Sequence, residues 1–134
     1  MYSPLIPFLR YRDVRAAHDW LINAFGFESY DTTEVDGTIV HAELSWRGLA
    51  SLQLGSAVED GAVIMLSPLD LPGLNQGVYL YVGEPAEVDE QFKRAVAAGA
   101  PVVYEPRDAP YGARDFGVRD LEGHYWSFGS YIAK

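Results

Sequence analysis

The sequence contains no cysteine, and it has few basic residues. Without cysteine the chain can form neither disulfides nor thiolate metal sites, and it has no thiol nucleophile. A protein without disulfides suits a reducing compartment, so we expect a cytoplasmic location. Ten Lys and Arg residues against 19 Asp and Glu residues give a net charge of −9. Such a surface repels phosphate groups, so we expect neither a nucleic-acid partner nor an anionic membrane partner.

Long apolar runs are missing as well. No stretch approaches the roughly 18 apolar residues of a membrane-spanning helix. Residues 1–13 lack the basic-then-apolar pattern of a signal peptide. The 134 residues, 49% of them hydrophobic and 22% charged, match a globular chain that buries a substantial core. We therefore expect one domain over residues 1–134.

The order of the elements is repeated along the chain. An alternating segment at 4–13 predicts a strand, and Asp13 and Gly26 then predict the start and the end of a helix. Three strand patterns follow, separated by turn signals at 36–37 and 47–48. The segment 56–76, rich in glycine and proline, breaks this periodicity and predicts a connector.

The same order of strand, helix and three strands returns after the connector. The second helix is expected to begin at Glu84-Pro85 and to end at Gly99, because proline is tolerated in a first turn and glycine favours a helix end. Its apolar stripe is expected to consist of Val88, Phe92, Ala95 and Val96.

These patterns predict an α+β fold of two βαβββ modules. The first module is expected at 1–55 and the second at 77–134, joined by the connector 56–76. A small sheet with one helix covers only one of its faces. Two such sheets are expected to leave a concave mixed-sheet cavity, which is the kind of surface that binds ligands.

His41 and Glu43 are the best candidates for catalytic residues. They alternate with Val40, Ala42 and Leu44, whose apolar face should pack beneath the helix. His41 and Glu43 would then face the cavity, where they could contact a ligand, act as an acid/base pair or bind a metal in an atypical way. Solvent exposure or a cross-strand hydrogen bond with Gln53 is the alternative.

Alternation also defines an aromatic face in the second module. Tyr79 and Tyr81 alternate with aliphatic residues, and an aromatic face suits either a cavity that stacks planar ligands or a core. In the last strand, Tyr125 and Ser127 are expected to point inward, opposite a packed tryptophan.

Arg114 lies in the strand before this one. Its guanidinium could clamp a ligand carboxylate with two hydrogen bonds, or it could bridge to a neighbouring acidic side chain. The sequence alone leaves both roles open.

The two modules and the closing motif "RD-x-EGH-x-W-S-F-G" resemble the vicinal oxygen chelate superfamily. The segments "PFLRYRD", "HAEL" and "YGARDFGVRDLEGHYWSFGSY" match most closely. This superfamily includes glyoxalase I, extradiol dioxygenases and bleomycin-resistance proteins. The chain looks most like its glyoxalase/bleomycin-resistance-like branch, and the resemblance implies the same fold.

In metal-dependent members of that superfamily, His, Gln or Glu ligands come from the first and last strands of each module. The first strands here offer residues 4–7 and 77–78, none of which is a ligand type, and the last strands offer Gln53 and Ser127. Ser127 stands where glutamate is usual. Because catalytic divalent sites need about three protein ligands, we predict no metal and no cofactor, with a divalent metal as the alternative.

Because those positions hold few ligands, we expect metal-free binding of a small organic molecule, and the resemblance implies a cationic, aromatic, antibiotic-like compound as one version of it. It also implies a homodimer, which the exposed sheet edges favour. The alternative is a metal-dependent or His/Glu acid-base enzyme (a lyase, isomerase or dioxygenase), and a non-catalytic interaction domain is a third hypothesis. The expected ligand-binding residues are His41, Glu43, Gln53, Tyr79, Tyr81, Arg114, Tyr125 and Ser127.

Overall fold

The computed structural model describes residues 3–133 and divides into two compact units. The first unit is Met1–Pro72 and the second is Gly73–Lys134. Each unit is described by itself below.

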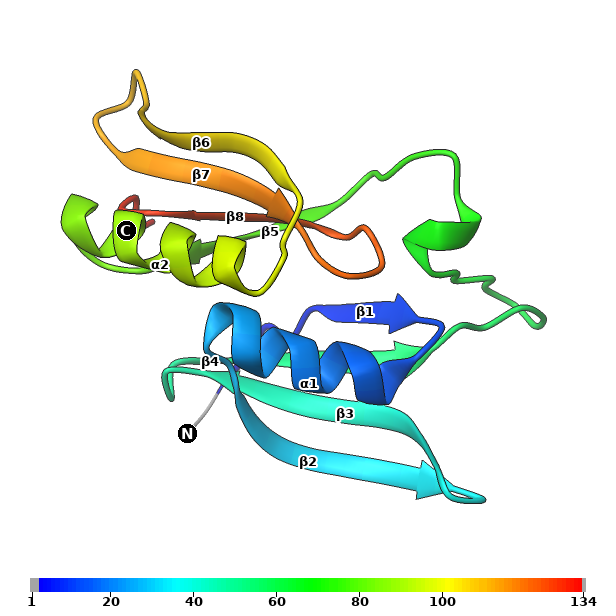
Figure 1. The fold of residues 1–134 in the computed structure, drawn as a ribbon. Coiled ribbons are helices and arrows are strands. Elements are labelled where there is room, and N and C mark those ends of the chain that lie inside the picture. Colours follow the sequence, from blue (N-terminus) through cyan, green and yellow to red (C-terminus); the bar gives the residue numbers. More distant parts are fainter. Residues whose placement is uncertain (1–2, 134) are drawn as a thin grey trace. The chain divides into compact units, whose positions relative to one another are not determined.

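The first unit is a four-stranded sheet with a helix across one face (Figure 1). The strand order is β1-β4-β3-β2; β1 pairs with β4 in parallel, and the other pairs are antiparallel. The elements in chain order are β1 (Phe8–Tyr11), α1 (Val14–Phe25), β2 (Glu28–Val35), β3 (Thr38–Trp46), β4 (Ala50–Ser56) and the short 3-10 helix η1 (Pro68–Asp70).

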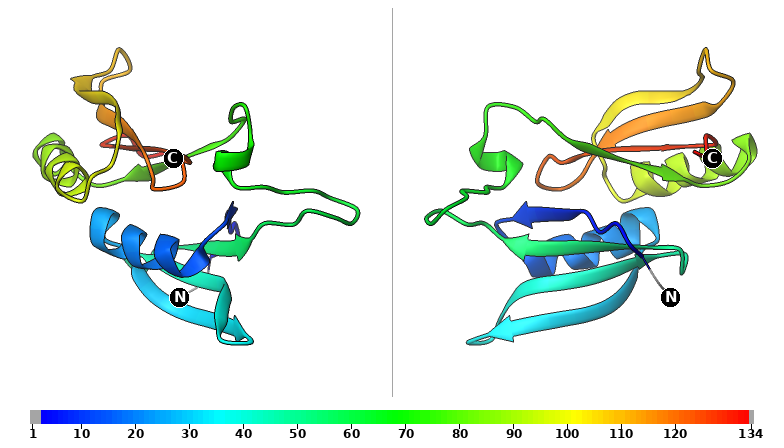
Figure 2. Two further views of the ribbon diagram at one scale, coloured as in Figure 1. Left: turned by 45° about the vertical axis from the view of Figure 1, so that its right-hand side comes forward. Right: turned by 180° about the vertical axis from the view of Figure 1, so that it is seen from behind.

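The second unit repeats this arrangement with the order β5-β8-β7-β6, in which β5 and β8 are parallel. Figure 2 shows from two further directions that α2 stays on one face of its sheet. The elements are β5 (Gly77–Tyr81), α2 (Pro85–Ala97), β6 (Val102–Asp108), β7 (Arg114–Arg119) and β8 (Tyr125–Gly129). The predicted α+β fold of two βαβββ modules with mixed sheets is thereby confirmed.

The ends of α1 follow the sequence signals. The Asp13 carboxylate accepts a hydrogen bond from the Ala16 amide at 3.0 Å and so satisfies one of the free donors of the first turn. Gly26 follows the helix with φ 93°, a left-handed conformation that glycine adopts without strain. The buried side of α1 includes Val14, Ala17 and Leu21, which recur with the period of a helix.

The predicted stripe of α2 is wrong at Val96, which is 44% exposed. The buried positions are Val88, Gln91 and Ala95, while Phe92 is half-buried. Successive helical positions differ by about 100°, so Val96 lies on a different side of the helix from the buried Ala95. The spacing of Val96 from Phe92 fits a helical stripe, but the buried face is centred on the side of the helix that carries Val88, Gln91 and Ala95.

Strand alternation separates two faces in each sheet. Ala42, Leu44 and Trp46 of β3 are buried, and β3 contacts α1. In the second unit Trp126 and Phe128 of β8 are fully buried, as the sequence predicts. The intervening residues of these strands therefore point to the face away from the helix.

The predicted connector contains local structure that the sequence did not signal. Val58 and Met65 form an isolated antiparallel bridge, and Ser67 caps η1. The Arg12 guanidinium forms a two-bonded ion pair with Asp70, whose pKa it lowers. Within residues 3–133, no helix has the length and apolar character needed to cross a membrane.

The turn between β7 and β8 is organised by the buried carboxylate of Asp120. It accepts hydrogen bonds from the Glu122 and His124 amides and from the Trp126 indole nitrogen, each at 3.0 Å. One carboxylate thus satisfies three donors, two of them in the turn and one in the core.

We predict that Asp120→Ala destabilises the protein by about 3 kcal/mol, because it leaves buried donors without an acceptor. Urea unfolding measures this change. The matched control Asp60→Ala removes an exposed acidic side chain from the connector and should stay within about 0.5 kcal/mol of the parent. Equal free energies of unfolding for the two variants would contradict the role given to Asp120.

Candidate functional site

The first unit brings three of the predicted site residues together. Glu43 on β3 lies opposite Gln53 on β4, and His41 lies two residues before Glu43. Gln53 Nε2 donates to Glu43 Oε1 at 3.2 Å, and Gln53 Oε1 lies 3.4 Å from His41 Nε2. The cross-strand hydrogen bond considered for this pair is therefore present, and the amide of Gln53 stands between the two candidate acid/base groups.

Arg10 extends this polar face, although it is not among the site residues expected from the sequence. In the sheet register, Gly55 lies between Arg10 and His41. A Cβ on Gly55 would lie 2.5 Å from Arg10 Nη1, so the missing side chain makes room for the guanidinium. Arg10 Nη1 donates to the Ser56 carbonyl at 3.1 Å.

These side chains border a small pocket of about 200 Å³, called here the polar pocket. The Arg10 guanidinium carbon lies 5.7 Å from the centre of the Phe8 ring. The sequence contained a signal for both residues, because Phe8 and Arg10 alternate with the buried Leu9 and Tyr11. The lining residues are Phe8, Arg10, His41, Gln53, Leu54 and Gly55.

The register identifies which residues stand side by side on the first and last strands of each unit. Phe8 pairs with Gln53 in the first unit, and Tyr79 pairs with Ser127 in the second. Gln53 is thus the one side chain among these four with a ligand atom of the expected type. In the part of the chain that the structure describes, no group of three or more His, Asp or Glu side chains is placed to hold a metal ion.

A larger pocket lies in the second unit. It measures about 670 Å³ and is called here the tyrosine pocket. The Tyr131 ring stands edge-on to Tyr79 at 6.3 Å and to Tyr111 at 5.7 Å between ring centres. Such edge-to-face contacts fix the rings while leaving other ring faces available. The lining residues are Tyr79, Tyr81, Tyr111, Tyr131, Ile132 and Ala133.

Behind these rings lies the carboxylate of Asp115, which is only 4% exposed. The Tyr111 hydroxyl donates to Asp115 Oδ2, and this bond, together with burial, raises the pKa of the Tyr111 phenol. The Tyr79 hydroxyl accepts from the Tyr131 amide at 3.1 Å. Burial is the main cause of the raised pKa of Tyr79, and the charge of Asp115 adds to it.

Gly129 leaves space for the Tyr79 hydroxyl and for the Asp115 side chain. It lies between Tyr81 and Asp115 in the register, as Gly55 lies between Arg10 and His41 in the first unit. A Cβ on Gly129 would collide with the Tyr79 hydroxyl and lie 2.6 Å from the Asp115 Cβ and 2.9 Å from the Arg114 carbonyl oxygen.

Tyr125 and Ser127 lie beside the tyrosine pocket's strands but are not among its lining residues. Ser127 Oγ donates to the Phe116 carbonyl at 3.1 Å and lies 3.0 Å from the Tyr104 hydroxyl. Burial, with a hydrogen bond to Tyr104, raises the pKa of Tyr125 to about 12. The structure thus places these two residues in a hydrogen-bonded group with Tyr104.

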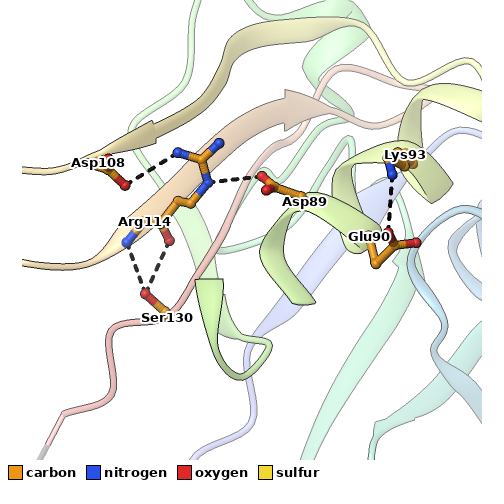
Figure 3. Close-up of polar contacts among 6 residues, drawn as sticks. All are labelled: Asp89, Glu90, Lys93, Asp108, Arg114 and Ser130. Atoms are coloured by element: carbon orange, nitrogen blue, oxygen red, sulfur yellow. Dashed lines mark hydrogen bonds and ion pairs between the residues drawn. The ribbon is translucent and has the colours of Figure 1, made fainter. Parts of the chain in front are cut away.

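Arg114 is held by acidic side chains of its own unit, as Figure 3 shows. Its Nε donates to Asp89 of α2 at 2.9 Å, and its Nη1 donates to Asp108 of β6 at 3.3 Å. Its backbone amide donates to Ser130 Oγ at 2.9 Å. This is the bridging role of the two that the sequence left open, and it ties α2 to the sheet.

Tyr111, Tyr131 and Asp115 are not among the site residues expected from the sequence. Tyr131 could have been found, because it lies an even number of residues after Tyr125 and Ser127 and so continues the same face of the strand beyond the end of β8. Asp115 likewise alternates with buried Phe116. Tyr111 lies in the loop before β7, where no periodicity indicates the direction of a side chain.

Two βαβββ units, each with a mixed sheet covered by one helix on one face, define the class of paired βαβββ proteins. The chain belongs to the Glyoxalase/Bleomycin resistance protein/Dioxygenase superfamily, whose family model matches residues 6–128.

Relatives and solved structures agree with this membership. The uncharacterised protein Rv0887c of Mycobacterium tuberculosis is 32% identical over 126 residues, which cover 93% of this chain and 72% of that protein. TioX from Micromonospora sp. ML1 is 33% identical, with a TM-score of 0.76 over 98% of this chain and 100% of its own.

A further similar structure is the fosfomycin resistance protein FosX of Listeria monocytogenes, which was solved in a complex with Mn(II). Its TM-score is 0.69 over 98% of this chain and 93% of its own. At 17% identity, this likeness shows the fold alone.

Gly55 and Gly129 occupy equivalent positions, so the effects of replacing each by alanine can be compared. Neither glycine has a left-handed φ, so alanine tests space alone. Gly129→Ala should cost about 2 kcal/mol, because the new methyl group meets backbone as well as side chains. Gly55→Ala should cost less than about 1 kcal/mol, because only the end of the flexible Arg10 side chain has to move. Urea unfolding compares them, and a larger cost for Gly55→Ala would contradict this account.

Proposed function

We propose that the protein binds a small organic molecule with a planar aromatic part, without a metal ion, in the tyrosine pocket. The single observation that carries this proposal is a pocket of about 670 Å³ whose walls include four tyrosine rings. This volume lies within the range of roughly 300–1,000 Å³ that is typical of small-molecule sites.

The rings suit an aromatic ligand for two reasons. Tyr79 and Tyr81 are each more than a third exposed, so a ligand can cover ring area that water now contacts. Aromatic pairs also gain about 0.5–1.5 kcal/mol beyond the burial of area. The contacts with Tyr131 hold the rings of Tyr79 and Tyr111 in place before binding, which limits the entropy lost when a ligand orders them.

The donor set supports binding without a metal. Of the residues that line the tyrosine pocket, none carries an imidazole or a carboxylate side chain, and divalent ions need such ligands. An antibiotic-like compound, as expected from the sequence, is one version of this ligand.

Binding of the neutral two-ring compound 1-naphthalenemethanol, followed by calorimetry or NMR, tests the proposal. Tyr79→Ala and Tyr81→Ala should each weaken binding about three- to tenfold, because each removes one ring face. Tyr30→Ala is the matched control, since Tyr30 lies on β2 of the first unit and is 74% exposed. Binding should persist after treatment with EDTA.

Two results would overturn this function. One is equal binding by the Tyr79 variant and the Tyr30 control. The other is stoichiometric Zn, Ni, Fe or Mn in the purified protein whose removal abolishes binding.

We keep an acid/base enzyme as a second candidate function because of the hydrogen-bond chain at the polar pocket. The Gln53 amide N–H donates to Glu43, so Gln53 Oε1 faces His41 and can accept a hydrogen bond from His41 Nε2. The imidazole tautomer with its proton on Nε2 has an unprotonated Nδ1, which is the atom that a general base needs.

For this candidate, a glutathione hemithioacetal is the test substrate. Turnover should fall at least about 100-fold in His41→Ala, since general-base catalysis contributes factors of that order. The control His18→Gln changes a histidine of α1 whose ring contacts Asp19 and Ser29, and it should keep the parent rate. Absence of turnover in the parent protein excludes this reaction.

A homodimer and a cytoplasmic location, both expected from the sequence, remain predictions. Among residues 3–133, the outer strands of each sheet (β1 and β2, or β5 and β6) have one edge without a partner strand in the same unit, and a second subunit could cover such edges.

A further inference from the structure

Three side chains of the first unit form a hydrogen-bonded series that neither candidate site above uses. His18 Nδ1 lies 2.8 Å from Asp19 Oδ1, and His18 Nε2 lies 2.8 Å from Ser29 Oγ. The imidazole thus stands between a carboxylate and a hydroxyl, with one ring nitrogen on each. This is the order in which an orienting acid, a histidine base and a serine nucleophile are connected in acyl-transfer enzymes.

The register of the sheet brings the hydroxyl to the helix. Ser29 lies on β2 opposite Leu44 of β3, and Leu44 is buried on the face that α1 covers. Residues directly opposite each other on neighbouring strands share a face of the sheet. Ser29 therefore faces α1, where His18 meets it.

A β-bulge in β2 is needed for this placement. The register shifts by one residue between Ser29 and Asp31, so Tyr30 is the extra residue of the bulge. Asp31 lies opposite Glu43, on the face away from α1. Without the extra residue Ser29 would share that face, because residues two apart in a strand point the same way. Bulges that re-aim a side chain are common next to active sites.

The histidine and the serine differ in exposure as nucleophilic catalysis needs. The His18 side chain is only 13% exposed, so its ring is largely covered by the protein. Ser29 is exposed on the outermost strand of its sheet. A reactant can therefore reach the hydroxyl, while the base behind it is held in position.

The Asp19 carboxylate decides which ring nitrogen carries the proton. An ionised carboxylate can only accept, so His18 Nδ1 donates to Asp19. In the neutral imidazole Nε2 then has a lone pair, and it accepts the hydrogen bond of the Ser29 hydroxyl. The hydroxyl proton is thereby directed at the atom that would remove it, as general-base catalysis requires.

The surroundings of Ser29 restrict the reactant that it can use. Ser29 lines neither the polar pocket nor the tyrosine pocket, so a reactant gains little binding energy beside it. An ester with a poor leaving group needs such binding energy to be cleaved. A phenyl ester with an electron-withdrawing group needs less, because its leaving oxygen carries charge readily.

We propose that Ser29 is the nucleophile of a second site, which transfers the acyl group of small activated esters to water. His18 is the general base of this site, and Asp19 is a positioning residue that holds the imidazole. The activity goes beyond the proposed ligand binding, since these three residues belong to the first unit and the tyrosine pocket lies in the second.

Each step of the reaction conserves atoms and protons. The Ser29 oxygen bonds to the ester carbonyl carbon while His18 Nε2 takes the hydroxyl proton. The bond to the phenol oxygen then breaks, and this oxygen receives the proton from His18. A water molecule next attacks the acyl group, its proton passes through His18 to the Ser29 oxygen, and the carboxylic acid is released. No oxidant or reductant takes part.

Release of p-nitrophenol from p-nitrophenyl acetate by the full chain tests the proposal. Ser29→Ala and His18→Ala should each slow the release at least about tenfold, because each removes the base-activated nucleophile or its base. Ser51→Ala is the matched control, since it removes a hydroxyl from β4 of the same sheet and should keep the parent rate. Circular dichroism checks that the variants are folded.

Covalent labelling separates this mechanism from hydrolysis by an imidazole alone. A fluorophosphonate should form a bond from phosphorus to the Ser29 oxygen with loss of fluoride, and peptide mass spectrometry identifies the modified residue. A histidine that acts alone would leave Ser29 unlabelled and would make Ser29→Ala as fast as the parent. Either observation overturns the proposal.

The role of Asp19 is tested by removing its carboxylate and by restoring one. Asp19→Ala should slow the release about tenfold, because the imidazole loses the acceptor that keeps its proton on Nδ1. Asp19→Glu keeps a carboxylate and should recover most of the parent rate. Asp60→Ala, which removes an exposed acid of the connector, is the control. Equal rates for Asp19→Ala and Asp60→Ala would remove Asp19 from the site.

The outcome is independent of the two functions considered above. Release no faster than in buffer overturns the acyl-transfer site, but it leaves the binding of 1-naphthalenemethanol at the tyrosine pocket untouched. A hemithioacetal has no acyl leaving group, so His18→Gln remains a control for the reaction considered at the polar pocket.

Discussion

One helix covers only one face of each four-stranded sheet, and this constraint organises both units. Because strand residues alternate between faces, burying Ala42 and Leu44 under α1 directs His41 and Glu43 to the other face. The same rule buries Phe116 under α2 and directs Asp115 away from it. In each unit, packing on one face therefore decides which side chains are available for chemistry on the other. The polar pocket and the tyrosine pocket are both consequences of this division.

A glycine in the last strand of each unit shapes the available face. Gly55 gives its space to the Arg10 guanidinium, and Gly129 gives its space to the Tyr79 hydroxyl and to Asp115. The two glycines occupy equivalent positions in the strand registers, but different side chains surround them. An arginine and a histidine lie beside Gly55 in the first unit, whereas tyrosines and an aspartate lie beside Gly129 in the second. The superfamily fold leaves such a choice open, which explains how one architecture can support unrelated functions.

Most of the fold could be predicted from the sequence because its determinants are local. Asp13 and Gly26 mark the ends of α1 through contacts within one helical turn, and the strands show a period of two. Where local signals were weak, prediction failed. Val96 is apolar and adjacent to the stripe of α2, yet it is exposed, while the uncharged Gln91 is buried on the face that carries Val88 and Ala95. The ordered contacts of the connector, such as the Arg12–Asp70 pair, link residues 58 positions apart and have no local signature.

The sequence by itself determined the two modules, the faces of their strands and the positions of the tyrosines, because hydrophobic periodicity specifies which side of an element is buried. Only the tertiary structure decided how these side chains are used. It engaged Arg114 with Asp89 and Asp108, placed the Gln53 amide between His41 and Glu43, and brought Tyr111 from a loop onto Asp115. These contacts depend on the register between strands or on the path of a loop. The alternation of residues within a single strand determines neither of these.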